Sequence, residues 1–307
     1  MEKKICILDT DIGDDIDDAF ALALMLGNDD IDLKAVTTVY KNTRLRALQA
    51  KQLINAYKKD VKVYYGEGMP LSNHITPFTT EFVNETGDLI NNKPCQYDES
   101  MQGEVLPNAV DAIIELAKKY QNELIIVTIG PLTNIAAAIK KEPLITKWVK
   151  KIYSMGGWFT NSVPEWNILC DAVAADIVYK SGIEIYSCGL DVTLKCTLDE
   201  ELLTKLKTSK KETIKLLNKY FNRWEEYFHF EKSVMHDPLA ITCVTDEVCT
   251  FKPKYVKVSL EKNNSGAVLV NDSPMDGYSL INVAEDVDRD KFYTIVMKRL
   301  FKNENNL

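Results

Sequence analysis

Short apolar segments alternate with segments of helical period along most of this chain, and this alternation restricts its fold more than any other feature. Apolar segments of strand length lie at 4–10, 31–39, 123–129, 148–155 and 183–192, and helical segments at 17–27, 43–59, 131–141 and 170–182. Strands that are apolar on both faces and separated by helices are typical of a parallel sheet covered on both sides. The sequence therefore predicts an α/β fold with a mainly parallel central sheet flanked by helices.

Nothing in the sequence divides the chain into separate parts. Its 307 residues, 46% of them hydrophobic, can bury a large core, and no internal repeat, low-complexity tract or linker interrupts them. Residues 66–107 are polar and rich in turn formers, which indicates a surface excursion. Later segments are expected to form helix over 197–232, a helix at 238–244, a strand at 255–260 and a hairpin around 263–265. We expect a single domain spanning 1–307.

Charge and hydropathy narrow the range of partners. The net charge of −8 gives no field that would gather a polyanion, so we expect no nucleic acid and no membrane as a partner, and a small neutral ligand fits better. Only four apolar residues stand between Lys4 and Asp9, which is too few for a secretion signal. No segment reaches the roughly 18 to 20 apolar residues of a spanning helix. We expect a cytoplasmic protein.

The seven cysteines are scattered along the chain and form no CxxC pair. This spacing argues against a disulfide framework or a zinc site. We expect them to be small buried apolar residues.

Six aspartates lie between Asp9 and Asp18, where an apolar strand is expected to pass into an apolar helix. Mutual repulsion makes such a turn unfavourable unless a cation, or a proton shared between carboxylates, compensates it. The alternation of a strand would put Asp9 and Asp11 on one face, and a helix that begins near Asp14 would add carboxylates from the same turn. The turn is thus expected to direct four or five carboxylates into one concavity.

A hard divalent cation would compensate these charges. The helix dipole stabilises one or two of them by roughly 0.3 to 1 kcal/mol each, which is too little for a cluster of this size. Carboxylates without histidine or thiol partners suit calcium or magnesium rather than zinc or copper. The spacing is not that of an EF-hand, because Gly13 stands where a ligand is required and Phe20 where the bidentate glutamate should be.

Five motifs carry a family resemblance. They are DTDIGDDIDDAFAL (9–22), IGPLTNIAAAI (129–139), MGGWFTNSVPEWN (155–167), GLDVT (189–193) and MHDPLA (235–240). In this order they resemble the calcium-dependent nucleoside hydrolases of the inosine–uridine-preferring type. The resemblance implies a single α/β domain, Ca²⁺ as cofactor, a homo-oligomer (dimer or tetramer), and hydrolysis of the N-glycosidic bond of a ribonucleoside to ribose and free base.

The same resemblance implies roles for individual residues. Calcium would be held by three carboxylates and one backbone carbonyl, those of Asp11, Asp18, Asp237 and Ile129. Asp17 would take the proton from a calcium-bound water. The ribose would be held by Asn42, Asn161, Glu165 and Asn167, with Met155 beneath the sugar.

Two departures from the family pattern leave alternatives open. The family has one residue between its glycine and the paired aspartates, whereas this chain has three, so that Asp14 or Asp15 could take the metal or base role instead. His74, within the 66–107 excursion, does not match the family's histidine–glycine loop, and both purine and pyrimidine bases stay open.

The implied chemistry agrees with these residue types. Cleavage of a ribosyl C–N bond passes through an oxocarbenium-like state, which carboxylates favour. Calcium would orient the cis hydroxyls of ribose and lower the pKa of a bound water that an aspartate deprotonates. His236 could protonate the leaving base. Rings that could stack on the base are Trp158, Phe159, Trp166, Trp224, Tyr227 and Phe228.

Two other functions fit parts of the sequence. A phosphatase of the haloacid-dehalogenase type also begins with a strand-end DxD, with Asp9 as nucleophile, Asp11 as acid and base, Thr128 at the phosphate, and magnesium. A phosphatase would have no role for the pair His236 and Asp237 or for the EWN segment at 165–167. A non-catalytic calcium-dependent binding protein for nucleosides or sugars would share the whole ligand set, and only an assay separates it from an enzyme.

Overall fold

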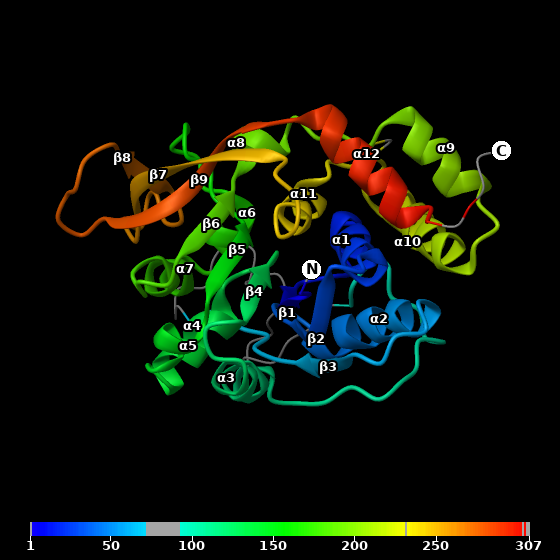
Figure 1. Cartoon of the computed structure of the whole chain (residues 1–307), viewed down its shortest axis with the longest axis horizontal. Helices are drawn as coiled ribbons and strands as arrows, with labels where there is room; N and C mark the ends of the chain where they lie inside the picture. The colour runs from blue at the N-terminus through cyan, green and yellow to red at the C-terminus, as the bar shows by residue number, and fades with distance from the viewer. Residues whose placement is uncertain (1, 72–92, 231, 303, 305–307) are drawn as a thin grey trace.

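The computed structural model describes residues 2–71, 93–230, 232–302 and 304, and in these residues one nine-stranded sheet runs through the molecule (Figure 1). The strand order is β3-β2-β1-β4-β5-β6-β9-β7-β8. The strands are β1 (Lys4–Thr10), β2 (Ile31–Thr38), β3 (Lys62–Tyr65), β4 (Ile125–Thr128), β5 (Lys151–Met155), β6 (Ile185–Cys188), β7 (Cys249–Val258), β8 (Val268–Asn271) and β9 (Ser279–Val287). Neighbours from β3 to β9 are parallel, and β7 is antiparallel to β9 and β8. The predicted fold class is confirmed.

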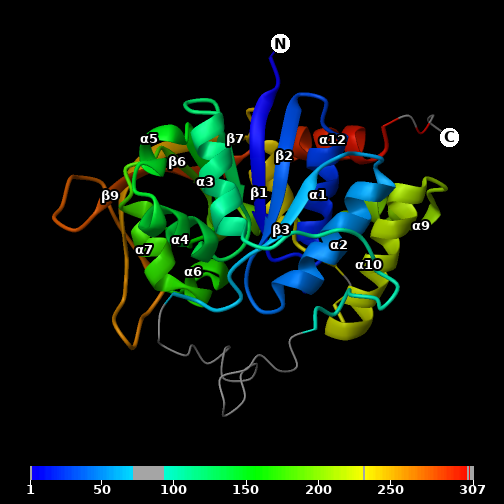
Figure 2. The ribbon, with the colours of Figure 1, turned by 90° about the horizontal axis from the view of Figure 1, so that it is seen from below.

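Helices cover both faces of this sheet (Figure 2). One core cluster includes α1 (Asp17–Gly27), α2 (Thr43–Ala56), α8 (Leu190–Thr193), α9 (Glu200–Thr208), α10 (Glu212–Phe228), α11 (His236–Thr242) and α12 (Arg289–Leu300). The other includes α3 (Ala109–Lys119), α4 (Thr133–Lys141), α5 (Ile145–Trp148), α6 (Trp166–Cys170) and α7 (Ala172–Tyr179). In β1, Cys6 and Leu8 pack in the first cluster and Ile7 in the second. Both faces are buried, which is why the strand is apolar throughout.

Several element boundaries differ from the expectation. The helical segment expected over 197–232 is two helices, α9 and α10, and the helix expected at 238–244 begins two residues earlier, at His236. Pro238 lies in its first turn, where a missing N–H costs no helical hydrogen bond. The residues 72–92, which include His74 and much of the predicted excursion, lie outside the described part of the chain.

The carboxyl-terminal part of the sheet was anticipated only in part, since the strand expected at 255–260 overlaps the end of β7 but the place of β9 was not predicted. Strand β9 lies between β6 and β7, and α12 packs in the core cluster that contains α1. The expected hairpin is present, since Val258 of β7 is paired with Val268 of β8. None of the described helices has the length and apolar character needed to cross a membrane.

Candidate active site

A cavity of about 490 Å³ opens where β1, β4 and β5 end and where α1 and α11 begin. Parallel sheets bind ligands at this carboxyl edge. Its lining consists of Asp11, Asp14, Asp15, Asp17, Asp18, Lys41, Lys93, Ile129, Met155, Glu165, Trp166, Asn167, Leu190, Tyr227, Phe228, His236 and Asp237. All the predicted site residues line this cavity except Asn42 and Asn161.

The turn between β1 and α1 is held by the buried guanidinium of Arg46. This side chain donates hydrogen bonds to the backbone carbonyls of Asp11 and Ile12, the latter at 3.0 Å. Gly13 has a φ of +126°, and a Cβ at this position would lie 2.6 Å from the Cβ of Pro94. Glycine is therefore required here by conformation and by space, and the turn presents its aspartates in a fixed arrangement.

Asp9 does not belong to this cavity, and the expectation that it shares a strand face with Asp11 is wrong. Strand β1 ends at Thr10, so Asp11 follows the strand. The buried Asp9 carboxylate accepts hydrogen bonds from Thr37 Oγ1 at 2.6 Å and Asn134 Nδ2 at 2.8 Å. Burial raises its pKa to about 7. Asp9 thus connects β1 to β2 and to α4, and it is not placed as a nucleophile.

Three buried carboxylates from α1 and α11 converge at the cavity. Asp17, Asp18 and Asp237 each offer an oxygen within 4.8 Å of the other two. The backbone N–H of Asp237 donates to Asp17 Oδ2 at 3.1 Å, and the Thr10 hydroxyl donates to Asp18. Burial, and then repulsion by neighbouring carboxylates, raises the pKa of all three. Such a group can only be stable with protons or a cation between its members.

Asp11 adds a fourth carboxylate to this edge of the cavity. Burial raises its pKa to about 6, although the guanidinium of Arg46 acts in the opposite direction. The Ile129 backbone follows β4 directly and lines the same cavity. Four carboxylates and a carbonyl oxygen form a donor set of hard oxygen atoms.

The two remaining aspartates of the turn have other partners. Asp14 pairs with Arg46 at 2.8 Å and with Lys41 at 3.1 Å. Burial opposes ionisation of Asp14, but these two cations outweigh it and lower its pKa. The carboxylate of Asp15 accepts a hydrogen bond from the Ile16 N–H at 2.6 Å. The helix begins at Asp17 and not near Asp14 as expected, because the Arg46-bound turn extends through these residues.

Glu165 and Asn167 form another part of the cavity wall, at the start of α6. The Glu165 carboxylate accepts hydrogen bonds from three backbone N–H groups, those of Gly157, Asn167 and Ile168, at 3.0, 2.8 and 3.2 Å. Burial nevertheless raises the pKa of Glu165. The Asn167 amide donates to the carbonyls of Ile129 at 3.2 Å and Met155 at 3.3 Å. This wall is thereby joined to the ends of β4 and β5.

His236 reaches the cavity from the first turn of α11. Its Nδ1 lies 2.7 Å from the Thr193 hydroxyl oxygen of α8. Burial lowers the pKa of His236 to about 4, so the imidazole is neutral near pH 7. If the hydroxyl donates to Nδ1, the proton of the imidazole is on Nε2, and if the hydroxyl accepts, the proton is on Nδ1.

Aromatic side chains form part of the lining. Of the six rings singled out in the sequence, Trp166, Tyr227 and Phe228 line the cavity. Trp224 and Phe159 are buried in the two core clusters. Tyr227 is 66% exposed, so α10 offers the cavity a ring that can contact a ligand.

Asn42 and Asn161 lie outside the cavity lining. The Asn42 side chain caps α2 by accepting from the Leu45 N–H at 3.1 Å. Asn161 is exposed, and its side-chain oxygen accepts from the Val163 N–H at 3.0 Å. Their sugar-binding roles stay predictions.

Arg46, Lys41 and Lys93 were not identified from the sequence. Arg46 shares its helical phase with the buried Ala50 and Leu53, and this phase is the signal that separates it from the exposed Arg44. Lys41 and Lys93 follow no pattern that distinguishes them from surface lysines. Both line the cavity, where Lys41 pairs with Asp14, whereas Lys93 pairs with Glu99.

Comparison with known proteins agrees with this geometry. The family model for the inosine-uridine preferring nucleoside hydrolases matches residues 6–294. A probable uridine nucleosidase 2 of rice is 30% identical over 98% of this chain and 94% of its own. The inosine-uridine preferring nucleoside hydrolase of Crithidia fasciculata is 30% identical over 98% of both chains. A solved plant nucleoside hydrolase superposes with a TM-score of 0.82, at 26% identity, over 97% of this chain and 99% of its own.

The fold and the acidic cavity at the carboxyl edge of its sheet thus define a hydrolase of nucleosides. The chain belongs to the inosine-uridine preferring nucleoside hydrolase family. The resemblance drawn from the sequence is confirmed, and the phosphatase interpretation is wrong.

Proposed function

We propose that this enzyme hydrolyses the N-glycosidic bond of a ribonucleoside with Ca²⁺ as its cofactor and Asp17 as its general base. The observation that supports this most is the convergence of Asp17, Asp18 and Asp237, whose oxygens lie within 4.8 Å of one another at the cavity. These carboxylates, with Asp11, are buried without enough positive charge nearby to balance them. Oxygen donors alone favour calcium or magnesium over softer metals.

Asp11, Asp18, Asp237 and the carbonyl of Ile129 would hold the calcium ion. When bound, calcium supplies positive charge that orients the ribose hydroxyls and lowers the pKa of a water. Their raised pKa values show how unfavourable these carboxylates are without a cation. The residues present therefore fit the ion that the family resemblance implies.

Asp17 is the best placed proton acceptor. One of its oxygens is fixed by the backbone N–H of Asp237, which leaves the other free to accept a proton from water. Its pKa is raised by burial, so this carboxylate is a stronger base than an exposed aspartate. Asp14 and Asp15 are the alternatives, but Asp14 is paired with two cations and Asp15 with the backbone.

Glu165 and Asn167 would bind the sugar. A carboxylate has about four acceptor positions, and three backbone N–H groups occupy three of those of Glu165, so one remains for a ribose hydroxyl. The buried negative charge of Glu165 also favours the positive sugar of the transition state. Met155 would lie beneath the ribose, and Asn42 and Asn161 would need to move to reach it.

His236 would protonate the leaving base. Because its imidazole is neutral, it can give up only the proton of one ring N–H, which would be that of Nε2 when the Thr193 hydroxyl donates to Nδ1. Tyr227 and Phe228 would stack on the base and exclude water from it. Stacking tolerates purines and pyrimidines alike.

Domain organisation, assembly and location belong to the same proposal. The continuous sheet supports one domain over 1–307, and the seven free cysteines suit the reducing cytoplasm. We expect a homo-oligomer, a dimer or tetramer, to be found by light scattering of the purified protein. No nucleic acid or membrane partner is expected.

A panel of common ribonucleosides, including inosine and uridine, tests the proposal. Release of ribose should require calcium, stop on addition of a chelator and return when calcium is added in excess. Hydrolysis that persists after dialysis against the chelator would overturn the metal role. Nucleoside binding without ribose release would instead indicate a protein that kept the fold and lost turnover.

A further inference from the structure

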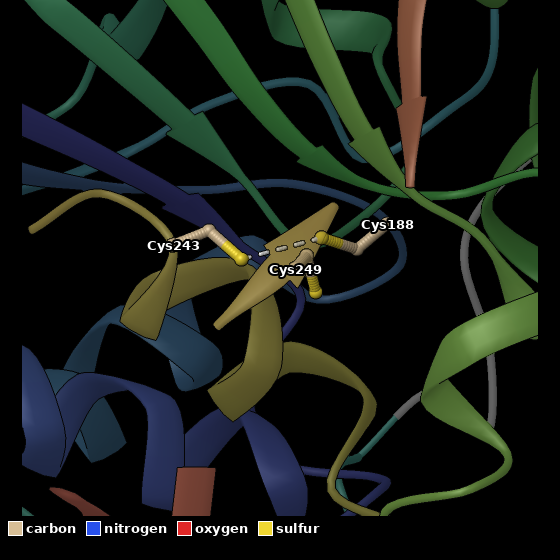
Figure 3. A group of neighbouring side chains, drawn as sticks. All are labelled: Cys188, Cys243 and Cys249. Atoms are coloured by element: carbon tan, nitrogen blue, oxygen red, sulfur yellow. Dashed lines mark hydrogen bonds between the residues drawn. The ribbon is translucent and has the colours of Figure 1, made fainter. Parts of the chain in front are cut away.

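Cys188 meets Cys243 and Cys249, which follow it by 55 and 61 positions in the sequence, near the carboxyl end of α11 (Figure 3). Cys188 ends β6, Cys243 follows the last turn of α11, and Cys249 begins β7. The sulfurs of Cys188 and Cys243 are 3.8 Å apart, and all three sulfurs lie within 4.8 Å of one another. We call these three residues the thiol group.

The spacing of these sulfurs is that of metal ligands. Zn–S bonds of about 2.3 Å place tetrahedrally arranged sulfurs about 3.8 Å apart, and three-coordinate ions require only slightly more. Among the described residues, no histidine, aspartate, glutamate or further cysteine is close enough to join the group. A site of sulfur ligands alone selects soft ions such as Zn²⁺ and Cu⁺ over calcium and magnesium.

The placement and burial of the three cysteines also fit a metal site. The sulfur of Cys249 lies beside those of Cys188 and Cys243, so that one ion can contact all three. Cys249 is half-buried whereas Cys188 and Cys243 are buried, which gives an ion one way in.

We propose that the thiol group is a second metal site, which binds one thiophilic d10 ion, Zn²⁺ or Cu⁺, through Cys188, Cys243 and Cys249. Each thiol that binds exchanges its S–H bond for a sulfur–metal bond and releases one proton to solvent, with no change of oxidation state. Zn²⁺ would take a water as fourth ligand, and Cu⁺ is complete with three sulfurs. The sequence predicts no such site, because Cys243 and Cys249 form no CxxC pair and Cys188 lies more than fifty positions before them.

A bound ion would connect the end of β6, the end of α11 and the start of β7. These are the elements where the parallel part of the sheet meets its antiparallel extension. The fold should therefore become more resistant to heating when the site is loaded.

Cobalt is the sharpest probe, because only thiolate ligands give its complex an intense charge-transfer band in the near ultraviolet. The whole protein is first saturated with calcium, so that the carboxylates of the cavity do not compete. One equivalent of Co²⁺ should then produce the band. Added Zn²⁺ should displace the Co²⁺ and remove the band. A protein that shows no such band, and no zinc-dependent rise in Tm, would overturn the proposal.

Two variants assign the ligands. Cys249→Ser should lose most of the band and weaken Zn²⁺ binding by at least about a hundredfold, since changes in second-shell partners alone already cost about 10 to 100-fold. Cys6→Ala, which removes a buried cysteine of β1 outside the thiol group, should keep both. Ribonucleoside hydrolysis by each variant reports that it is folded. Equal bands in the wild type and Cys249→Ser would contradict the assignment.

A parallel competition under anaerobic conditions separates the two ions. The affinity of the protein for each ion is measured by competition with a chelator of known affinity for that ion. If the affinity for Cu⁺ is higher than that for Zn²⁺, the site is a three-coordinate copper(I) site, and the reverse order identifies zinc. Binding of both ions that is unchanged in Cys249→Ser would place them elsewhere and overturn the proposal.

Discussion

The acidic cavity and the thiol group are the two proposed metal sites, and they share helix α11 but differ in their donor atoms and in how they are assembled. Helix α11 carries Asp237 in its first turn and ends next to Cys243. The first cluster consists of oxygen donors that suit calcium, and the second of sulfur donors that suit zinc or copper(I). Because the two donor types select different ions, each cluster can be loaded without the other.

The two clusters also differ in how they are assembled. Most of the acidic cluster comes from one turn, so its charge density is visible in the sequence. The thiol group comes from three strand and helix ends that only the folded sheet brings together. A site built from neighbouring residues can be read from the sequence, whereas a site built by topology cannot.

Loss of a calcium ligand should have the largest effect. Asp11→Ala should lose calcium binding and lower kcat/KM by more than about a thousandfold, because a bound cation contributes several kcal/mol to the transition state. The cobalt band of the thiol group should stay unchanged. Calorimetry and ribose release measure both effects, with the exposed Asp60→Ala as the matched control. Tight calcium binding with normal turnover in Asp11→Ala would disprove the site assignment.

Loss of the base should separate turnover from metal binding. Asp17→Asn keeps the shape of the side chain and its hydrogen bond to the Asp237 N–H, so calcium should still bind. Turnover should be at least about a hundredfold slower, the usual effect of a lost general base. The matched variants Asp14→Asn and Asp15→Asn should be much more active. If one of them loses turnover while Asp17→Asn does not, that residue is the base.

Loss of the partner of His236 should have a smaller effect. Thr193→Val removes the hydroxyl that lies 2.7 Å from Nδ1, and kcat should fall by up to about tenfold with little change in KM, since one hydrogen bond is worth about 0.5 to 1.5 kcal/mol. Thr193→Ser restores the hydroxyl and should restore the rate. Equal rates in the valine and serine variants would show that Thr193 does not position the imidazole.

The smallest expected effect is a pH dependence of stability that comes from the cavity carboxylates. Their pKa values are raised in the folded protein, to about 6 for Asp11 from 3.8, so the calcium-free protein binds more protons than the unfolded chain. The contribution of these carboxylates to the free energy of unfolding should therefore be fully present below pH 3.8 and be lost as pH rises through about 6. The calcium-induced rise in Tm should grow over the same range. A rise in Tm that is independent of pH would contradict the raised pKa values.

Much of the fold and part of the site follow from residue patterns, and the remainder depends on tertiary contacts. The apolar segment ending in Asp9 and the helix after Asp18 correctly predict β1 and α1, because both elements are buried along most of their length. The orientation of Asp9, away from the cavity, is set by Thr37 and Asn134 on other elements.

The missed features share this dependence on distant partners. The role of Arg46 comes from carbonyls of a turn more than thirty positions away in the chain. Strand β9 is inserted between β6 and β7, and the order of strands in a sheet has no local signature. Asp14 resembles its neighbours in the sequence, and only its ion pairs with Lys41 and Arg46 separate it from them.

A crystal structure of the protein grown with calcium tests the central claim most directly. We expect one calcium ion in the cavity, bonded to oxygens of Asp11, Asp18 and Asp237 at about 2.3 to 2.6 Å. A well-ordered cavity without an ion, with these carboxylates turned towards solvent, would contradict it.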